Sequence, residues 1–257
     1  MNLEIKKEGD FEYVEVGSGP VLMLLHGLFG ALSNFHDVID HFSKRYTVTI
    51  PLMPIYTLPI ISTNVKNLAK HIDEFIEFKG YVKPILVGNS LGGHVGLIYT
   101  SQNVEKVKYL VLTGSSGLYE NAFGSSFPRK NDYNYIKERV GLTFYDPNVA
   151  TKELVDEVWD LIGDRGKALR SISLAKSAIR SNMASELPSM NLPVCLIWGR
   201  NDTITPPEVA EEFHRELPDS DLFWVEKCGH AAMMEHPKEF NNILDAWLEK
   251  RNQNLAQ

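Results

Sequence analysis

Short apolar runs and amphipathic stretches alternate along most of this chain. From Val65 to Phe78, apolar side chains recur at three- and four-residue intervals, which is the spacing of one helical face. Further helices are expected over Asn34–Phe42, His94–Gln102, Pro207–Glu216 and Phe240–Lys250. The runs between them are typical of strands, and they cover Phe11–Val16, Val21–Leu25, Tyr46–Ile50, Pro84–Val87, Val107–Leu112, Val194–Trp198 and Leu222–Val225. Strands interleaved with helices predict a parallel sheet covered on both faces.

The regular alternation is interrupted between residues 115 and 190. This stretch has no convincing strand pattern, but Glu153–Ile162 and Lys167–Met183 have the apolar spacing of helices. We therefore predict a core domain formed by residues 1–114 and 191–257, and a helical insertion over residues 115–190. A helical insertion within a regular sheet protein is expected to form a lid, or cap, over the functional site.

The overall composition argues against several classes of protein. The 257 residues are 44% hydrophobic and 23% charged, near the average of globular domains and enough to bury a large core. A formal net charge of −7 argues against nucleic acid or an anionic membrane as partner. The longest apolar run, Val21–Leu25, is too short to span a membrane, and the N-terminal residues lack the apolar core of a signal peptide. Two cysteines make no disulfide framework, so we expect a cytoplasmic protein, either monomer or homodimer.

The segment Gly88-Asn89-Ser90-Leu91-Gly92 stands between an expected strand and an expected helix. A serine at such a turn has its hydroxyl lifted clear of the sheet, where a base and a substrate can reach it. The turn needs glycine on both flanks, because the chain comes so close to itself that a Cβ atom would clash. Ser90 is therefore the candidate nucleophile.

A serine nucleophile needs a base to take its proton, usually a histidine that a carboxylate holds in the right tautomer. In parallel α/β sheets such groups lie just past the carboxyl ends of strands. Asp202 and His230 each follow a predicted strand, so they are the candidate acid and base. For the other histidines we expect a backbone role at His26, capping or packing at His94 with lining of the site as the alternative, and surface positions at His36, His41, His71 and His214.

Acyl transfer through a serine also needs two N–H donors aimed at the developing oxyanion. The N–H of Leu91, directly after the nucleophile, is one candidate, and its place at a helix start favours negative charge. The second is expected in the loop after Val21–Leu25, from Leu28, with Phe29 as the alternative. The sequence contains no cluster of metal-ligand residues and no phosphate-binding loop, so neither a metal nor an organic cofactor is predicted.

Four segments, in this order, resemble the α/β-hydrolase superfamily: His26-Gly27-Leu28-Phe29-Gly30, Gly88 to Gly93, Trp198 to Asp202, and Cys228-Gly229-His230. The resemblance covers nearly the whole chain and is to the branch with a helical cap inserted after the sixth strand. It implies an α/β-hydrolase fold with an eight-stranded, mostly parallel sheet, and hydrolysis through an acyl-enzyme. It does not fix the substrate.

The segment Pro51–Ile60 departs from this family pattern. Relatives usually carry a turn with glycines and an aspartate after the strand near Ile50, whereas this segment has no glycine, no acidic residue and many apolar side chains. We expect it to form an apolar wall for an acyl chain and a surface on which the cap docks. A patch for a protein partner is the third interpretation.

A serine at the nucleophile position argues against haloalkane dehalogenases and epoxide hydrolases, which place an aspartate there. Carbon–carbon hydrolases of aromatic-ring degradation resemble this chain in Asn89 and Asn34, but often have an aromatic residue where it has Ala231. The menaquinone-pathway lyase of the superfamily tends to have an arginine near the position of His94, so this interpretation is weaker. A non-catalytic ligand-binding protein would be expected to lack part of the catalytic triad, whereas Ser90, Asp202 and His230 are all present here.

We therefore predict a serine carboxylesterase that acts on small to medium esters through Ser90, His230 and Asp202. The alternative is hydrolysis of a carbon–carbon bond in 2-hydroxy-6-oxo-dienoates. The side chains expected to contact the substrate are those of Phe29, Asn34, Asn89 and Met233.

Overall fold

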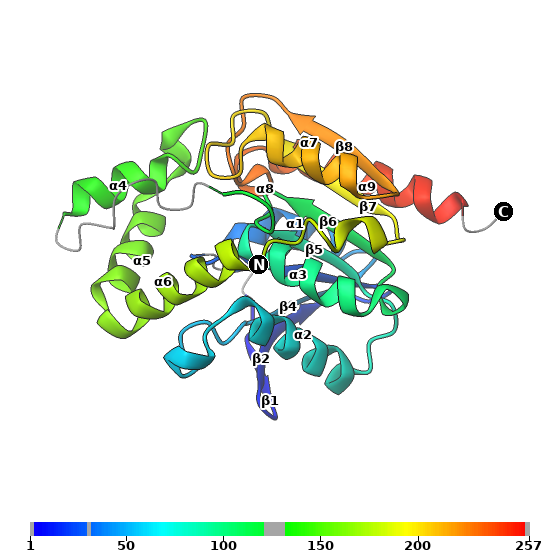
Figure 1. Cartoon of the computed structure of the whole chain (residues 1–257), viewed down its shortest axis with the longest axis horizontal. Coiled ribbons are helices and arrows are strands. Elements are labelled where there is room, and N and C mark those ends of the chain that lie inside the picture. Colours follow the sequence, from blue (N-terminus) through cyan, green and yellow to red (C-terminus); the bar gives the residue numbers. More distant parts are fainter. Residues whose placement is uncertain (1–2, 30–31, 121–131, 255–257) are drawn as a thin grey trace.

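An eight-stranded sheet forms the centre of the molecule (Figure 1). The computed structural model describes residues 3–29, 32–120 and 132–254, so Gly30 and residues 121–131 of the predicted insertion lie outside the described residues. The strand order is β1-β2-β4-β3-β5-β6-β7-β8. The bounds are β1 Lys6–Glu8, β2 Phe11–Val16, β3 Val21–Leu25, β4 Thr47–Pro51, β5 Ile85–Asn89, β6 Tyr109–Thr113, β7 Val194–Gly199 and β8 Ser220–Val225. β1 pairs antiparallel with β2, and β2 with β4, whereas every neighbouring pair from β4 to β8 is parallel.

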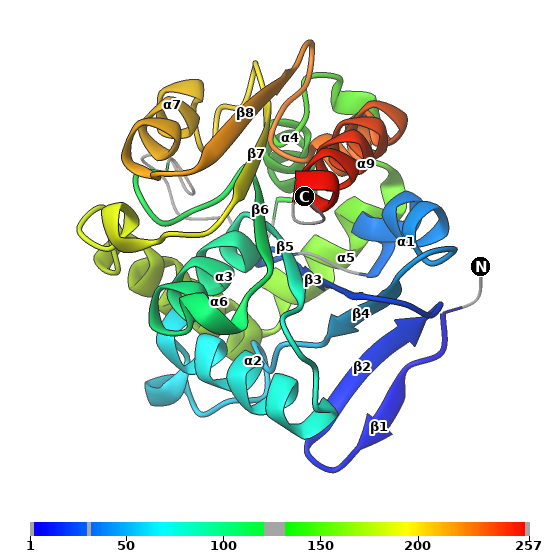
Figure 2. The same ribbon diagram turned by 90° about the vertical axis from the view of Figure 1, so that its right-hand side faces the viewer.

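Helices cover both faces of the sheet, as the alternating pattern predicts (Figure 2). One face carries α1 (His36–Phe42) and α9 (Pro237–Asn254), and the other carries α2 (Val65–Lys79), α3 (Leu91–Gln102) and α7 (Pro207–Glu216). Each layer buries its own hydrophobic cluster against the sheet. Because β5 and β6 are covered on both faces, all five residues of each strand are buried.

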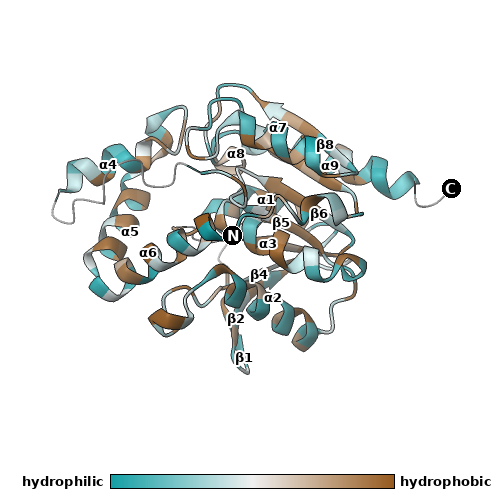
Figure 3. Ribbon diagram, viewed as in Figure 1, coloured by the Kyte–Doolittle hydropathy of each residue, from teal (hydrophilic) through white to brown (hydrophobic). Residues whose placement is uncertain are grey.

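Within the described residues between β6 and β7, three helices lie to one side of the sheet (Figure 1). They are α4 (Tyr133–Gly141), α5 (Lys152–Gly163) and α6 (Arg165–Arg180), called here the α4–α6 segment. Residues 114–120 and 132–193 contain no strand, as the sequence predicts. Figure 3 shows hydrophobic and hydrophilic residues side by side on α5, which is typical of a helix that buries only one face. Its buried residues Val158 and Ile162 form a small separate cluster with Ile136 of α4.

Local side-chain chemistry sets the ends of several helices. At the start of α2, Asn64 accepts a hydrogen bond from the backbone N–H of Asn67 at 2.9 Å, and Gly80, with φ 63°, ends that helix. Thr151 and Asp164 cap α5 and α6 in the same way. The observed bounds of α2 and α5 differ from the predicted ones by no more than one residue at either end.

The structure also contains elements that the sequence analysis did not predict. They are the edge strand β1, helix α4, the short helix α8 (Ala232–Glu235), and 3-10 turns at Leu32–Phe35, Ile60–Ser62, Val104–Lys106, Pro147–Val149 and Leu187–Ser189. Helix α3 begins at Leu91, directly after the serine, rather than at His94. The sequence pattern does not indicate β1, because this strand is short and charged and forms only by pairing with β2. No helix in residues 3–29, 32–120 or 132–254 is long and apolar enough to cross a membrane.

Candidate active site

Ser90 occupies a strained turn between β5 and α3. Its backbone angles are φ 53° and ψ −121°, in a region that side-chain-bearing residues rarely adopt. Such strain costs about 1–3 kcal/mol and persists only where surrounding contacts fix the chain. Here the Ser90 N–H donates to the carbonyl of Thr113 at 3.2 Å, and its own carbonyl accepts from Ser116 and His94, each at 3.1 Å. Two neighbouring segments therefore hold the serine at the carboxyl end of β5.

The glycines around Ser90 are required by close backbone approach. A Cβ atom on Gly88 would lie 2.5 Å from the Cα atom of Gly93, and one on Gly92 would overlap the carbonyl group of Leu25. Neither Gly88 nor Gly92 has a positive φ, so the constraint is space and not backbone angle. The expectation that glycine is needed on both flanks is confirmed.

The structure brings Asp202 and His230 into direct contact, although 28 residues separate them in the sequence. His230 Nδ1 lies 2.9 Å from Asp202 Oδ2. Asp202 follows β7 and His230 follows β8, and these strands are parallel neighbours, so their carboxyl ends share one edge of the sheet. Both residues are buried, which strengthens this polar contact relative to water.

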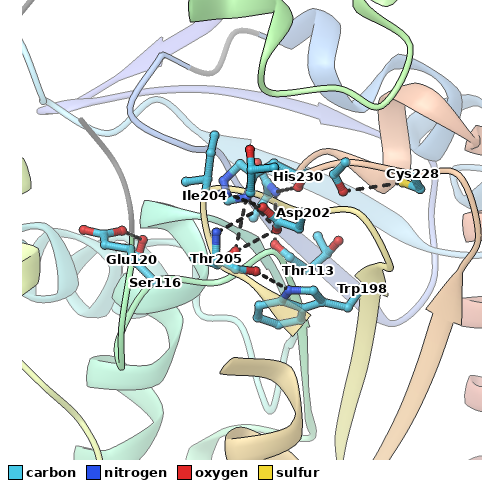
Figure 4. A network of polar contacts seen from close by, with 12 residues as sticks. Thr113, Ser116, Glu120, Trp198, Asp202, Ile204, Thr205, Cys228 and His230 are labelled. Carbon is cyan, nitrogen blue, oxygen red and sulfur yellow. Dashed lines mark hydrogen bonds and ion pairs between the residues drawn. The ribbon is translucent and has the colours of Figure 1, made fainter. Parts of the chain in front are cut away.

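The Asp202 carboxylate is fixed by three further donors. Oδ1 accepts from the N–H groups of Ile204 at 2.8 Å and Thr205 at 3.0 Å, and Oδ2 accepts from the Thr205 hydroxyl at 2.8 Å. The Thr205 carbonyl in turn accepts from Trp198 Nε1 at 2.8 Å (Figure 4). The role of Thr205 was not predicted; the available signal is Asp202 itself, because an aspartate side chain commonly accepts hydrogen bonds from the next few backbone N–H groups in a turn.

The backbone of His230 is anchored to the loop that follows α4. The His230 N–H donates to the Thr143 carbonyl at 2.7 Å, and a Cβ atom on Gly229 would lie 2.5 Å from that same carbonyl oxygen. Glu235 accepts from the N–H groups of Gly229 at 2.7 Å, Tyr145 at 3.2 Å and Asp146 at 2.7 Å. One carboxylate thus holds the His230 loop and the Tyr145–Asp146 loop together, and no sequence pattern identified it.

A cavity of about 480 Å³ opens beside these residues. From the sheet side it is lined by the predicted residues Leu28, Phe29, Asn34, Asn89, Ser90, Leu91 and His230, together with Ala231 and Met234. The α4–α6 segment supplies most of its apolar wall through Ile136, Val140, Leu154, Val158, Ile162, Ala175 and Ala178. Ser90 and His230 are therefore reachable from one largely apolar chamber.

Two expectations about the cavity wall are corrected. Met233 of α8 packs into the hydrophobic core, and its neighbour Met234 lines the cavity instead. No residue of Pro51–Ile60 lines the cavity, so this segment is not an acyl-chain wall. Met53 and Ile55 are instead buried in the hydrophobic core, and the Leu58 carbonyl accepts a hydrogen bond from Arg170 of α6. The α6 contact involves the predicted insertion, and docking of a cap on Pro51–Ile60 stays a prediction.

Asn89 is engaged with the protein itself. Its side-chain nitrogen donates to the carbonyls of Thr113 at 3.0 Å and His230 at 3.2 Å. It therefore ties the end of β5 to the His230 loop while also lining the cavity. By contrast, the buried side-chain oxygen of Asn34 finds no hydrogen-bond partner among the described residues.

Charged groups that the sequence analysis did not single out also line the cavity. Glu120 accepts a hydrogen bond from the Ser116 hydroxyl, to one side of the Asp202 cluster (Figure 4). Burial raises the pKa of the Glu120 carboxyl, although the Ser116 hydrogen bond and the nearby His230 lower it in part. Arg139 of α4 is the only arginine or lysine among the described lining residues. No group of three or more His, Cys, Asp or Glu side chains in residues 3–29, 32–120 and 132–254 could hold a metal ion.

Two buried histidines lie near the site without joining the Asp202 contact. His26 Nδ1 lies 2.9 Å from the Gly27 carbonyl, and burial lowers the pKa of its imidazole. His94 Nε2 lies 2.8 Å from the Ser181 carbonyl, and burial lowers the pKa of this ring to about 4. These contacts agree with the expected backbone role of His26 and packing role of His94.

Comparison with proteins of known sequence gives matches along nearly the whole chain. Residues 22–243 match the family model described as the alpha/beta hydrolase family. A 2-hydroxy-6-oxononadienedioate/2-hydroxy-6-oxononatrienedioate hydrolase of a Pseudomonas species is 26% identical over 257 residues, covering 92% of this chain and 90% of the relative. A 2-hydroxy-6-oxo-6-(2'-aminophenyl)hexa-2,4-dienoic acid hydrolase of Metapseudomonas resinovorans is 27% identical over 267 residues, covering 93% and 87%.

Solved structures match over a similar extent. MGS-MChE2, an alpha/beta hydrolase enzyme from the sediment metagenome of the lagoon of Mar Chica, is 47% identical with a TM-score of 0.81, covering 97% of this chain and 99% of that one. A putative lipase from Acinetobacter baumannii is 25% identical with a TM-score of 0.84, covering 98% and 92%. The likeness therefore includes the α4–α6 segment as well as the sheet.

Proposed function

This chain belongs to the alpha/beta hydrolase family, and we propose that it is a serine hydrolase with Ser90 as nucleophile, His230 as base and Asp202 as acid. The observation that carries the proposal is the 2.9 Å contact between His230 Nδ1 and Asp202 Oδ2, beside the cavity that also holds Ser90. With Nδ1–H committed to the carboxylate, Nε2 is the ring nitrogen that takes the Ser90 proton. Asp202 holds that tautomer and stabilises the imidazolium that forms during attack.

The oxyanion is assigned to the N–H groups of Leu91 and Leu28, with Phe29 as the alternative to Leu28. Leu91 is the first residue of α3, where backbone N–H groups have no partner within the helix. Leu28 and Phe29 line the cavity from the loop after β3, on the neighbouring strand of the sheet. Two donors from adjacent strand ends can therefore converge on one oxygen, the arrangement that acyl transfer requires.

For the bond that is cleaved, we propose the carbon–carbon bond next to the ketone of a 2-hydroxy-6-oxo-dienoate, the substrate class named for the curated relatives. Ser90 would attack the ketone carbon, the carbon leaving group would take a proton from His230, and water would release the acyl group. Asn34 and Asn89, shared with such hydrolases, both lie on the cavity wall. Arg139 offers a positive charge for the substrate carboxylate.

Ester hydrolysis is the second candidate, and it is the function that the sequence favours. Ala231 replaces an aromatic side chain after the base, and the walls from α4, α5 and α6 are mostly apolar. Glu120 would repel an anionic substrate to the extent that its carboxyl is ionised. These three features support small, uncharged esters. For either reaction, we propose that residues 115–190 form a cap that shapes the substrate cavity.

A matched pair of assays separates the two reactions. Purified protein would be given a 2-hydroxy-6-oxo-dienoate and, separately, p-nitrophenyl esters of increasing chain length, with Ser90→Ala as control. We expect a higher kcat/KM for the dienoate, and loss of both activities in Ser90→Ala. Fast ester turnover without dienoate cleavage would establish the esterase instead, and activity retained in Ser90→Ala would overturn the assignment of the nucleophile.

A further inference from the structure

The hydroxyl of Tyr56 contacts the loop to which the second oxyanion donor is assigned. Its Oη donates a hydrogen bond to the carbonyl oxygen of Leu28 at 2.6 Å, across 28 residues of sequence. Tyr56 belongs to the segment Pro51–Ile60, which departs from the family pattern in having no glycine and no acidic residue. The segment thus has a contact with the active site, although none of its residues lines the cavity.

This hydrogen bond restricts the orientation of a peptide group next to Ser90. The carbonyl of Leu28 and the N–H of Phe29 belong to one planar unit and point in opposite directions. A hydrogen bond that holds the Leu28 carbonyl therefore also holds the Phe29 N–H. It further restricts the backbone torsions of Leu28, which set the direction of the Leu28 N–H relative to that carbonyl. Both candidate donors, Leu28 and Phe29, are thereby oriented by one phenol.

The chain that follows Tyr56, from Leu58 to Val65, is held against helix α6 by a row of contacts. Arg170 Nε donates to the Leu58 carbonyl at 2.7 Å, and the Ser173 hydroxyl donates to the Thr63 carbonyl at 3.0 Å. One turn further along α6, the Ser177 hydroxyl accepts from the Val65 N–H at 3.2 Å. The position of the phenol is thus set by the same helix that forms part of the cavity wall.

The phenol is a donor under all ordinary conditions. Burial raises the pKa of Tyr56 well above its usual value, and a hydrogen bond with Ser171 of α6 lowers it only in part. The Tyr56 hydroxyl thus keeps its proton across the pH range in which a serine hydrolase works.

We propose that Tyr56 is a positioning residue that orients the Leu28–Phe29 peptide so that the oxyanion hole is formed before substrate binds. The inference rests on the proposed serine hydrolase function. The hydroxyl acts on the rate of the chemical step, because the oxyanion develops only in the transition state and the ground-state substrate gains little from the same donors.

The test removes one oxygen atom and compares it with a matched change elsewhere. Tyr56→Phe deletes the hydroxyl, and Tyr109→Phe deletes a phenol hydroxyl that bonds Asn252 at 3.2 Å, on β6 and away from the cavity lining. For each variant, kcat and KM would be measured on p-nitrophenyl acetate or the dienoate, whichever the wild type hydrolyses. The rate of Ser90 phosphonylation by a small fluorophosphonate, followed by intact mass, needs no knowledge of the natural substrate.

Removing an oxyanion donor outright costs 10²–10³ in rate, so loosening one should cost about tenfold. We expect kcat and the phosphonylation rate of Tyr56→Phe to fall together by about that factor, with KM within about twofold of wild type and Tyr109→Phe unchanged. Rates of Tyr56→Phe equal to wild type, or a lower melting temperature with unchanged kcat, would overturn the positioning role alone. Failure of wild-type Ser90 to react at all would overturn the proposed function, and this inference with it.

Discussion

The sheet core and the α4–α6 segment meet at one cavity, but they hold their side chains in different ways. Around Ser90 in the core, β5 is buried along its whole length and the backbone contacts leave no room for an added carbon. Helix α4, by contrast, buries only Ile136 and Gly141 of its nine residues. The core therefore holds Ser90 within a closely packed backbone, whereas the α4–α6 segment supplies much of the apolar wall of the cavity.

Polar contacts connect the two regions at a few identifiable points. His94 of α3 bonds the carbonyl of Ser181 after α6, and Glu235 joins the His230 loop to the Tyr145–Asp146 loop. Substitutions at these points should affect both regions together, unlike those inside either region. The contrast between the two regions can be tested by substitutions, given below from the largest expected effect on stability or activity to the smallest.

The largest effect is expected from adding one methyl group to each region. Gly92→Ala places a Cβ atom on the carbonyl group of Leu25, whereas Gly163→Ala at the end of α5 has nothing within 4 Å of the new atom. We expect Gly92→Ala to lose more than about 4 kcal/mol of unfolding free energy and its activity. Gly163→Ala should be neutral or stabilising by up to about 1 kcal/mol. Urea unfolding of both variants measures this, and similar losses would refute the contrast.

The contact between the regions at His94 should make stability depend on pH. Because burial lowers the pKa of His94 to about 4 in the folded state, and that of an unfolded histidine is about 6.5, the unfolded state binds the proton first. Stability should therefore fall as pH drops from about 6.5 toward 4, with a total loss on the order of 3 kcal/mol.

Urea unfolding at several pH values, compared with His94→Gln, isolates this contribution. The variant keeps an N–H donor that can reach the Ser181 carbonyl but cannot titrate, so its stability should fall less over the same range. If the unfolding free energies of wild type and His94→Gln fell in parallel as pH dropped, His94 would not be the cause of the pH dependence.

A smaller effect is expected at Glu235, because its three N–H partners lie in loops and not in the sheet. Glu235→Gln removes the charge and one acceptor, so the His230 loop should lose part of its support. We expect kcat to fall about tenfold, as 1.4 kcal/mol of lost transition-state stabilisation would produce. Glu239→Gln removes the same charge at an exposed position of α9 and serves as control. Equal kcat values for the two variants would contradict the positioning of His230 by Glu235.

The smallest effect on chemistry is expected from the apolar wall. Val158→Ala enlarges the cavity on the α5 side without touching Ser90 or His230. We expect the preferred ester chain length to increase and relative kcat/KM values to change by about tenfold, because one methylene group in a pocket is worth about 1–3 kcal/mol. Phosphonylation of Ser90 should proceed at the wild-type rate, and a slower reaction would show that the wall does control reactivity.

Much of the fold and of the site could be predicted because the relevant patterns are local. Helix α7 was predicted over its observed bounds, Pro207–Glu216, and strands β2 and β3 likewise. Asp202 and His230 could be paired from sequence because each follows a strand, and parallel strands bring their carboxyl ends to one edge. Helix α4 could not be predicted from the sequence, since its few buried residues give a weak periodic pattern.

The sequence by itself determined the alternation of strands and helices, the glycine turn around Ser90 and the order of the candidate triad, because these depend on neighbours along the chain. Only the tertiary structure decided which groups support that triad: Thr205 and Glu235 act through backbone and side-chain contacts that depend on how loops fold back on one another. It also decided that Met234, and not Met233, lines the cavity, since the orientation of α8 determines which of two adjacent side chains enters the core and which faces the cavity. The use of Tyr56 depends on the packing of Pro51–Ile60 between α6 and the loop after β3, a contact that no periodicity in the sequence encodes.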